Sequence, residues 1–259
     1  TPLFLYVPFN APHTPLQATE EQLERNAHIE VKNRRTYAAM VTSMDDAIGV
    51  IIDSVDEHFS RENTLIVFFS DNGGLVRLGS NGELRGEKDT LYEGGVRVPA
   101  IAAWEGTIDA GAVVEDPLHV VDLYPTLLGL AGGEVSQRLP LDGKDAWPSI
   151  IKGKAVKRAF ILYNLSPFHG AIRMGDWKLV HNGQAGANER TAKGEEQWEL
   201  FDLSVDPYET TDLSSKYPKE FRKLKAKLAE LSGVAVAPHI APRTIPSKFK
   251  APKIWGYAE

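Results

Sequence analysis

The stretch "TLIVFFSDNGG" at residues 64–74 decides the fold, because an apolar run stops there at an acid, an amide and two glycines. The apolar part is typical of a strand covered on both faces. A second such run at residues 3–9 ends in the proline-containing "NAPHTPL". Between them, apolar residues recur at helical spacing over residues 34–59, which predicts one long amphipathic helix. Strand, helix and strand in this order predict a right-handed crossover, parallel pairing and therefore an α/β domain.

The remaining sequence predicts a change of architecture near residue 155. Before it we expect a strand at residues 96–104 and a helix at 120–133, with Asp122 as its N-cap and Pro125 in its first turn. After it, the short runs "RAFILYN", "AIRMGDWKLVHN" and "EQWELFDL" predict a small antiparallel sheet, and a helix follows at residues 217–231. The predicted fold class is therefore α/β, with part of a mostly parallel sheet flanked by helices, then a small C-terminal antiparallel sheet with a helix. The predicted units are residues 1–154, a small α+β subdomain at 155–233, and an extended proline-containing tail at 234–259.

Composition excludes several classes of function. The 259 residues carry a formal net charge of -6, which leaves no basic stripe to neutralise the phosphates of a nucleic acid. No apolar run approaches the roughly 20 residues that span a bilayer, so we expect no membrane partner. The absence of cysteine excludes disulfides, thiolate metal sites and a cysteine nucleophile within this sequence. Because the chain opens directly on a buried-strand pattern, we expect it to be part of a longer protein.

Residues with chemical potential follow both predicted core strands. In an open parallel sheet, ligands bind beyond the carboxyl ends of the strands. His13 follows the first strand, and Asp71 and Asn72 follow the second. A carboxylate and an amide carbonyl are hard oxygen donors that suit Ca²⁺ or Mg²⁺ better than Zn²⁺. Adjacent strand residues point to opposite faces, so sharing one ion requires a backbone turn, which Gly73 and Gly74 permit.

The simplest alternative is that "DNGG" is only a turn, since Asn-Gly is a strong hairpin signal. However, residues 75–86, "LVRLGSNGELRG", are too rich in glycine and polar residues to supply the second strand of a hairpin. The next stretch, "LRGEKDTLYEGGVRVP" at residues 84–99, presents Arg85 and Lys88 on a glycine-interrupted loop. Such a loop suits the binding of an anion by charge and by directed N–H groups.

Taken together, these motifs resemble the formylglycine-dependent sulfatases of the alkaline phosphatase superfamily. The resemblance runs from residue 3 to about residue 213. Within the family it is strongest to the arylsulfatase B branch, the N-acetylgalactosamine-4-sulfatases. The motifs that carry it, in chain order, are "LFLYVPFNAPHTPL", "YAAMVTSMDDAIG", "VFFSDNGG", "LRGEKDTLYEGGVRVP", "HVVDLYPTLLGLAG", "IRMGDWKL" and "LFDLSVDPYETTDL".

The resemblance implies a role for each candidate residue. Asp71 and Asn72 match the acid and amide that complete the family's single Ca²⁺ site. Lys88 matches the lysine that grips a sulfate oxygen, and His13 matches the histidine near the leaving group, so both are expected to be catalytic and to bind substrate. Arg85 is expected to assist in substrate binding.

What the family has and this sequence lacks is also informative. The family's formylglycine nucleophile arises from Cys/Ser-x-Pro-Ser-Arg, which is not in this chain. The resemblance places that motif, the remaining Ca²⁺ ligands, and a further Lys and His before residue 1. Residues 1–154 then correspond to the C-terminal portion of a sulfatase catalytic domain. We expect the missing N-terminal part of the same protein to be its partner, and the isolated chain to be inactive.

The leading functional hypothesis is a sulfuric ester hydrolase that removes sulfate from a sulfated carbohydrate or an aryl sulfate. One alternative is a phosphodiesterase or phosphonate hydrolase of the same superfamily, but those relatives typically carry a histidine where this chain has Asn72. Another is a truncated, non-catalytic carbohydrate-binding protein. By resemblance, the protein is exported to the periplasm or the extracellular space, or lysosomal.

Several conspicuous residues are expected to be structural. Asp45 and Asp46 lie inside the predicted long helix, and adjacent helical residues project about 100° apart. Glu93 and Arg97 are expected to form a buried salt bridge that organises their loop. His119 is expected to be structural rather than catalytic, and the tryptophans Trp147, Trp177 and Trp198 are expected to pack in the core rather than to stack on a sugar.

Overall fold

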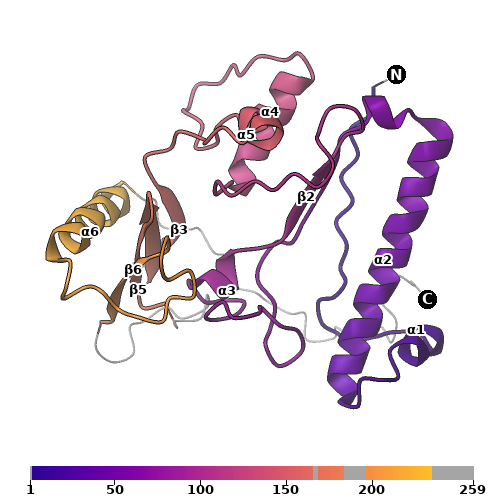
Figure 1. Ribbon diagram of the computed structural model, residues 1–259, viewed down its shortest axis with the longest axis horizontal. Helices are drawn as coiled ribbons and strands as arrows, with labels where there is room; N and C mark the ends of the chain where they lie inside the picture. The colour runs from indigo at the N-terminus through magenta and orange to yellow at the C-terminus, as the bar shows by residue number, and fades with distance from the viewer. Residues whose placement is uncertain (1, 166–168, 184–195, 235–259) are drawn as a thin grey trace, which may run out of the picture.

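Two antiparallel sheets organise the chain in the computed structural model (Figure 1), which describes residues 2–165, 169–183 and 196–234. The first sheet contains β1 (Ile66–Phe69) and β2 (Ala100–Ala103), and the second contains β3 (Ile161–Leu165), β4 (Gly170–Met174), β5 (Trp177–His181) and β6 (Trp198–Asp202). The helices are α1 (Glu20–Arg25), α2 (Lys32–His58), α3 (Glu93–Val96), α4 (Leu123–Leu130), α5 (Trp147–Lys152) and α6 (Pro218–Gly233), with short 3₁₀ turns η1 (Arg61–Asn63) and η2 (Val120–Asp122). None of the helices described is long and apolar enough to cross a membrane.

The N-terminal sheet differs from the sequence-based expectation. Strand β1 pairs antiparallel with β2, with Ile66 opposite Ala103 and Phe69 opposite Ala100. Residues 3–9, predicted as a buried parallel strand, form an extended segment outside any strand, and Figure 1 draws them running along α2. The side chain environment is open, since Leu5 is 63% exposed. The predicted burial is wrong because a buried strand needs a hydrogen-bonded neighbour and covering layers, and the described residues supply neither.

The predicted helix at residues 34–59 is confirmed as α2, which is 27 residues long. Only two of its residues, Ala39 and Met40, are buried. Helix α1 packs against it, and the Asn26 amide donates a hydrogen bond to the Thr42 hydroxyl at 3.0 Å. Most of the apolar stripe that the sequence places on this helix is therefore only partly covered.

The helix predicted at residues 120–133 forms as η2 followed by α4, with Asp122 at the predicted N-cap position. Its carboxylate makes no cap hydrogen bond to α4. It accepts instead from the backbone N–H groups of His119 at 2.8 Å and Lys144 at 2.9 Å, and it pairs with the guanidinium of Arg158. One buried carboxylate thus ties three segments of the chain together.

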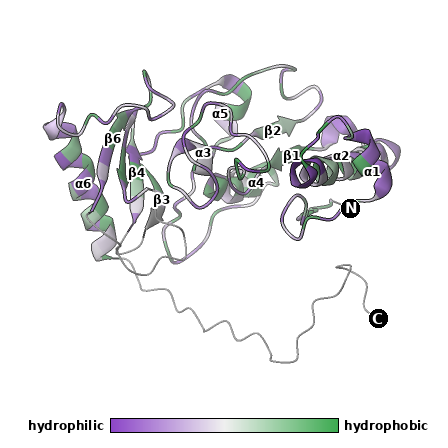
Figure 2. Ribbon diagram, turned by 90° about the horizontal axis from the view of Figure 1, so that it is seen from below, coloured by the Kyte–Doolittle hydropathy of each residue, from purple (hydrophilic) through white to green (hydrophobic). Residues whose placement is uncertain are grey.

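The predicted C-terminal antiparallel sheet is confirmed, in the order β3-β4-β5-β6. Strands β4 and β5 meet at a Gly-Asp turn, where Gly175 adopts a positive φ of 61° that favours glycine. One face of this sheet packs on α6, whose hydrophobic and hydrophilic residues alternate along its length in Figure 2. The core between them is fully or almost fully buried and consists of Ile172, Leu179, Leu200, Leu224 and Leu228.

The opposite face of the sheet packs on the loop that contains α3. Its core joins Leu91 and Tyr92 of the loop to Ala171, Val180 and Phe201 of the strands. The loop predicted to bind an anion therefore lies on the C-terminal sheet, while its glycines reach the end of β1. The predicted tail lies outside the described residues from residue 235 onward.

Candidate functional site

The predicted acid and amide lie just after the end of β1. The strand stops at Phe69 and the backbone bends at Asp71 and Asn72. The Asn72 Nδ2 donates to the carbonyl of Gly73 at 3.0 Å, which leaves its Oδ1 available. The exposed Asp71 carboxylate has neither a hydrogen bond nor an ion pair within the part of the chain that the structure describes. The hairpin alternative is wrong, because β1 pairs with β2 rather than with the residues after "DNGG".

Gly73 and Gly74 bring this strand end to the basic loop. The Gly73 N–H donates to the Gly95 carbonyl at 2.9 Å, and the Gly74 carbonyl accepts from the Lys88 N–H at 3.3 Å. Neither Gly73 nor Gly74 has a positive φ, so the expected turn is not why glycine is needed. A Cβ on Gly73 would overlap the Gly94 carbonyl oxygen, so close backbone approach is the requirement.

Asn81 holds the same junction together, although sequence analysis assigned it no role. Its Oδ1 accepts from the Gly74 N–H at 2.8 Å, and its Nδ2 donates to the Gly74 carbonyl at 2.9 Å and the Gly86 carbonyl at 3.1 Å. An asparagine that bridges two glycine-rich segments satisfies backbone groups that have no strand or helix to pair with. The signal was present as an isolated asparagine inside a glycine-rich stretch, but that pattern is equally typical of a solvated turn.

Lys88 lies at this junction through its backbone. The side chain is half-buried, and no ion pair to it forms among the described residues. Its neighbour Glu87 accepts a hydrogen bond from the Val76 N–H at 2.8 Å. Asp89 adopts a φ of 73°, a left-handed conformation uncommon for aspartate. The loop therefore brings the backbone of Lys88 to the strand end of Asp71 and Asn72, and no described residue neutralises its ammonium group.

Arg85 has a different environment from the one expected for a substrate-binding residue. Its guanidinium donates to Glu199 Oε1 at 2.9 Å and to the Glu209 carbonyl at 3.0 Å. It also lies 3.9 Å from the centroid of the Tyr92 ring. These contacts favour a structural role, in which Arg85 fastens the loop to β6, over direct contact with an anion.

His13 lies in a turn that no described contact connects to the other candidates. Its backbone N–H donates to the Asn10 carbonyl at 2.8 Å, and its Nδ1 lies 2.8 Å from the Thr14 carbonyl. The side chain is exposed. Of the four predicted catalytic and metal-binding residues, the structure joins Asp71, Asn72 and Lys88 through their backbone, while His13 stands apart.

Most of the residues expected to be structural make structural contacts. Glu93 is buried as expected, but its partner is Lys178 at 2.8 Å and not Arg97. His119 Nδ1 accepts from the Val121 N–H at 3.2 Å, and burial lowers the pKa of its imidazole. The three tryptophans contact other rings: Trp147 packs on Trp104, Trp177 on Tyr217, and Trp198 on His181 and Phe221.

The strand end suits a hard cation but supplies few ligands. A free carboxylate and a free amide oxygen are the donor types that Ca²⁺ prefers, and Ca²⁺ takes six to eight oxygens. Over residues 2–165, 169–183 and 196–234, no cluster of three or more His, Asp or Glu could hold a metal. The residues present therefore fit part of a Ca²⁺ site.

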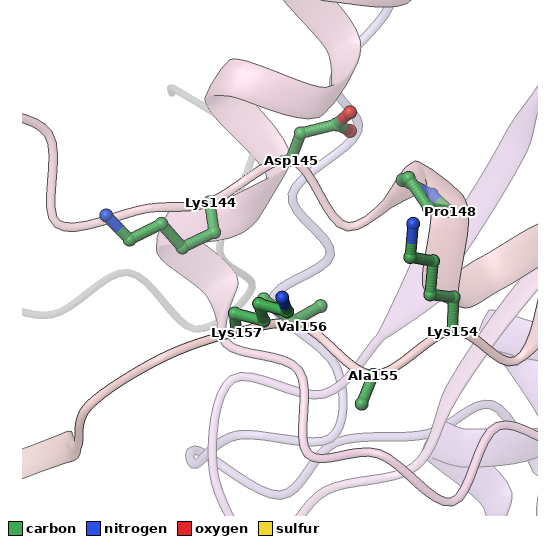
Figure 3. Close-up of a pocket in the computed structure, with 7 residues that line it drawn as sticks. All are labelled: Lys144, Asp145, Pro148, Lys154, Ala155, Val156 and Lys157. Atoms are coloured by element: carbon green, nitrogen blue, oxygen red, sulfur yellow. The ribbon is translucent and has the colours of Figure 1, made fainter.

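A pocket of about 370 Å³ lies apart from this site (Figure 3). It is lined by Lys144, Asp145, Pro148, Lys154, Ala155, Val156 and Lys157, none of which belongs to the strand end or the basic loop. Two features argue against an anion site. Figure 3 shows the Lys144 ammonium pointing away from Pro148 and Lys154, and the lysine-rich segment follows the C-terminus of α5, where the helix dipole favours cations.

Comparison with known proteins assigns the class. Residues 1–133 match the sulfatase family, and residues 85–233 match the family described as N-sulphoglucosamine sulphohydrolase, C-terminal. The chain is 34% identical to arylsulfatase J of Mus musculus over 93% of its own length and 47% of that protein. It superposes on the crystal structure of Ps i-CgsB with a TM-score of 0.75 and 34% identity, covering 86% of this chain and 48% of that one. Ps i-CgsB has also been solved in complex with k-i-k-neocarrahexaose.

The chain belongs to the sulfatase family, and its fold is alkaline-phosphatase-like. It spans about half the length of the relatives it matches. The similar proteins include arylsulfatase J and an N-acetylgalactosamine-6-sulfatase of Sus scrofa, to which it is 35% identical over 68% of this chain and 34% of that protein. The finer resemblance to arylsulfatase B stays a prediction.

Proposed function

We propose that this chain supplies one side of the active site of a sulfatase that acts on a sulfated carbohydrate or an aryl sulfate. The observation that carries the proposal is the backbone hydrogen bond from Lys88 to the Gly74 carbonyl, which brings the loop of Lys88 to the strand end that carries Asp71 and Asn72. Among the described residues, neither the Lys88 ammonium nor the Asp71 carboxylate has a partner. A cation site and a lysine in this arrangement would hold a sulfate ester between two positive charges. The complex of Ps i-CgsB with a carrageenan-type oligosaccharide supports a glycan as substrate.

Each residue has one task in this proposal. Asp71 and Asn72 would donate oxygens to Ca²⁺, which when bound supplies charge stabilisation to the sulfate oxygens. Lys88 would serve as a point charge against a sulfate oxygen, and such preorganised contacts strengthen as charge develops in the transition state. His13 is proposed to act on the leaving-group side. Arg85 would hold the loop in place instead of contacting substrate.

The nucleophile and the other Ca²⁺ ligands are proposed to come from a further part of the same protein. This sequence contains no cysteine and no motif from which formylglycine is made. The purified chain should therefore not hydrolyse 4-nitrocatechol sulfate. Turnover by this chain that disappears in Asp71→Ala would contradict the proposal, because a complete site would then lie within the 259 residues. An exported or lysosomal location is proposed on family resemblance alone.

The two alternative functions predict different enzymatic activities. A phosphodiesterase of the same superfamily would hydrolyse an aryl phosphodiester faster than an aryl sulfate once the longer protein is assembled. A non-catalytic carbohydrate-binding protein would bind sulfated oligosaccharides without turnover in any form. Asn72, with its oxygen free, favours Ca²⁺ and a sulfate ester over the nitrogen-ligated metals of the first alternative.

Calorimetry with Ca²⁺ tests the metal site in this chain directly. Binding should be weak, since two side-chain ligands fall far short of a full coordination shell. Asp71→Asn should abolish the residual signal, and Asp45→Asn on α2 is the matched control. Tight binding would mean that the site is built from other residues.

Kinetics on the longer sulfatase tests Lys88. Lys88→Ala should lower kcat/KM on the order of 10² to 10³, the typical cost of one such electrostatic contact. The exposed Lys219 on α6 provides the control substitution, Lys219→Ala. If kcat/KM were unchanged in Lys88→Ala, the loop would have no role in sulfate binding.

A further inference from the structure

A buried ion cluster of Lys178, Glu93 and Glu209 joins the proposed sulfate-binding loop to the C-terminal sheet. Lys178 on β5 is fully buried, and its Nζ donates to Glu93 Oε1 at 2.8 Å. The same Nζ forms an ion pair with Glu209 Oε1 at 2.8 Å, without the geometry of a hydrogen bond. Glu209 Oε2 in turn accepts from the backbone N–H of Glu93 at 2.6 Å. Lys178 thus holds the side chain of Glu93, and the Glu209 carboxylate holds its backbone.

A second link holds the other end of the loop. Arg85 bridges Glu199 on β6 and the backbone carbonyl of Glu209 at 2.9 and 3.0 Å. The Tyr92 hydroxyl donates to the same Glu199 carboxylate. Glu209 has a φ of 55°, a left-handed conformation that a bulky residue adopts only when its surroundings hold it there. Both links therefore converge on Glu209.

The two links flank Lys88 in the sequence, three residues before it and five residues after it. Within residues 2–165, 169–183 and 196–234, Lys88 itself is held only by the hydrogen bond from its backbone N–H to the Gly74 carbonyl. The position of its ammonium group relative to Asp71 therefore depends on where the sheet holds Arg85 and Glu93. A buried pair that merely stabilised the core could lie anywhere in the sheet. Here both links end on the segment that carries the proposed sulfate ligand.

We propose that Lys178 is a positioning residue, which holds residues 84–97 against the sheet so that Lys88 faces Asp71 and Asn72. The inference rests on the proposed function of Lys88, but the coupling it describes exists in this chain without substrate. Removing one partner from a buried ion pair leaves an uncompensated charge, which is far more disruptive than the loss of an exposed pair. Without Lys178, Glu93 and Glu209 would repel each other and the loop would open.

Hydrogen exchange of the purified chain tests this coupling. The reporter amides are those of Gly73, Lys88 and Gly94, each of which closes a hydrogen bond of the junction. Lys178→Met should accelerate their exchange about tenfold or more, because local opening becomes easier. The amides of Leu179 and Leu200, which lie in the core beneath α6, should change by less than about threefold. A purely structural role for Lys178 would accelerate both groups equally.

Two further variants complete the experiment. Lys219→Met, on the exposed surface of α6, should leave all amides unchanged. Glu93→Gln keeps an oxygen acceptor for Lys178 and should give the same local pattern at smaller amplitude, so it serves if Lys178→Met does not fold. Unchanged reporter amides in Glu93→Gln, or equal acceleration of loop and sheet, would overturn the inference. If instead Lys88→Ala left kinetics unchanged while the exchange pattern held, the proposed function would fall and the coupling would stand.

Discussion

The two sheets show opposite fates for similar apolar sequences. In the C-terminal sheet, Leu200 and Leu224 are fully buried between strands and α6. In the N-terminal sheet, Ile101 of β2 is 63% exposed, and the apolar residues of the neighbouring extended segment are exposed too. Both regions have the composition of buried strands. The difference shows that an apolar sequence does not by itself make a strand buried. Burial also requires neighbouring elements of the chain that cover the strand.

This contrast also divides the candidate site. Asp71 and Asn72 lie at the end of the N-terminal sheet, where side chains are open to solvent. The loop that carries Lys88 packs on the C-terminal sheet, where Lys178 and Glu209 are completely buried. The loop that carries Lys88 should be rigid in this chain, because it packs on a buried core. The strand end that carries Asp71 and Asn72 should become ordered only when a further part of the protein covers it.

Truncating one buried leucine of the C-terminal core and one exposed leucine of the N-terminal segment is the strongest test of this contrast. Leu224→Ala should lower the free energy of unfolding by about 2 to 5 kcal/mol, because it leaves a cavity in a closed core. Leu5→Ala should leave it within about 0.5 kcal/mol, as is usual for exposed positions. Urea unfolding followed by circular dichroism measures both. A large loss in Leu5→Ala would show that residues 3–9 are packed in solution.

The C-terminal half of the fold was predictable because its elements pair locally. Strands β4 and β5 are joined by a short turn at Gly175 and Asp176. The alternation of apolar and polar residues and the turn residues therefore define which strands pair. The strand at residues 64–70 was also found, but its pairing was not. Its actual partner, β2, lies some thirty residues away, and no local signal specifies a pairing over that distance.

The next largest effect is expected from two glycine substitutions, one at the junction of the loop with the end of β1 and one on the poorly covered helix α2. Gly73→Ala should destabilise the chain by about 1 to 3 kcal/mol, since its Cβ would overlap the Gly94 carbonyl and force the backbone apart. Gly49→Ala on α2 meets nothing within 4 Å and should stabilise by about 0.5 to 1 kcal/mol. Thermal melts of the two variants should move in opposite directions. Equal shifts would remove the close-approach argument for the junction.

The site was predictable only as a set of residue types. The order of Asp71, Asn72 and Lys88 along the chain indicated an anion and a cation site, and the structure joins their segments. The role of Arg85 was not predictable, because its partners Glu199 and Glu209 lie more than one hundred residues away. Asn81 was missed for the related reason that its hydrogen bonds serve backbone groups, which leave no side-chain pattern in the sequence.

The smallest predicted effect is the pH dependence of the stability that the buried ion cluster contributes. Burial raises the pKa of the Glu209 carboxyl above its usual range, although the facing Lys178 ammonium opposes this and the Glu93 carboxylate adds to it. In the window between the ordinary pKa of a glutamate, about 4.3, and the raised value, the folded chain then binds more protons than the unfolded chain. The stability contributed by Glu209 is therefore complete below this window and is lost as pH rises through the raised pKa.

Glu209→Gln should remove this dependence, because an amide does not titrate. The melting temperature of the unsubstituted chain, relative to that of the variant, should fall as pH rises through the window. Glu230→Gln, at an exposed position of α6, is the matched control and should leave the pH profile unchanged. Parallel profiles for the unsubstituted chain and Glu209→Gln would show that Glu209 keeps its ordinary pKa, so that Lys178 fully offsets the effect of burial. The environment of the buried ion cluster would then be less desolvated than its burial indicates. The difference between the buried C-terminal core and the exposed N-terminal sheet would be correspondingly smaller.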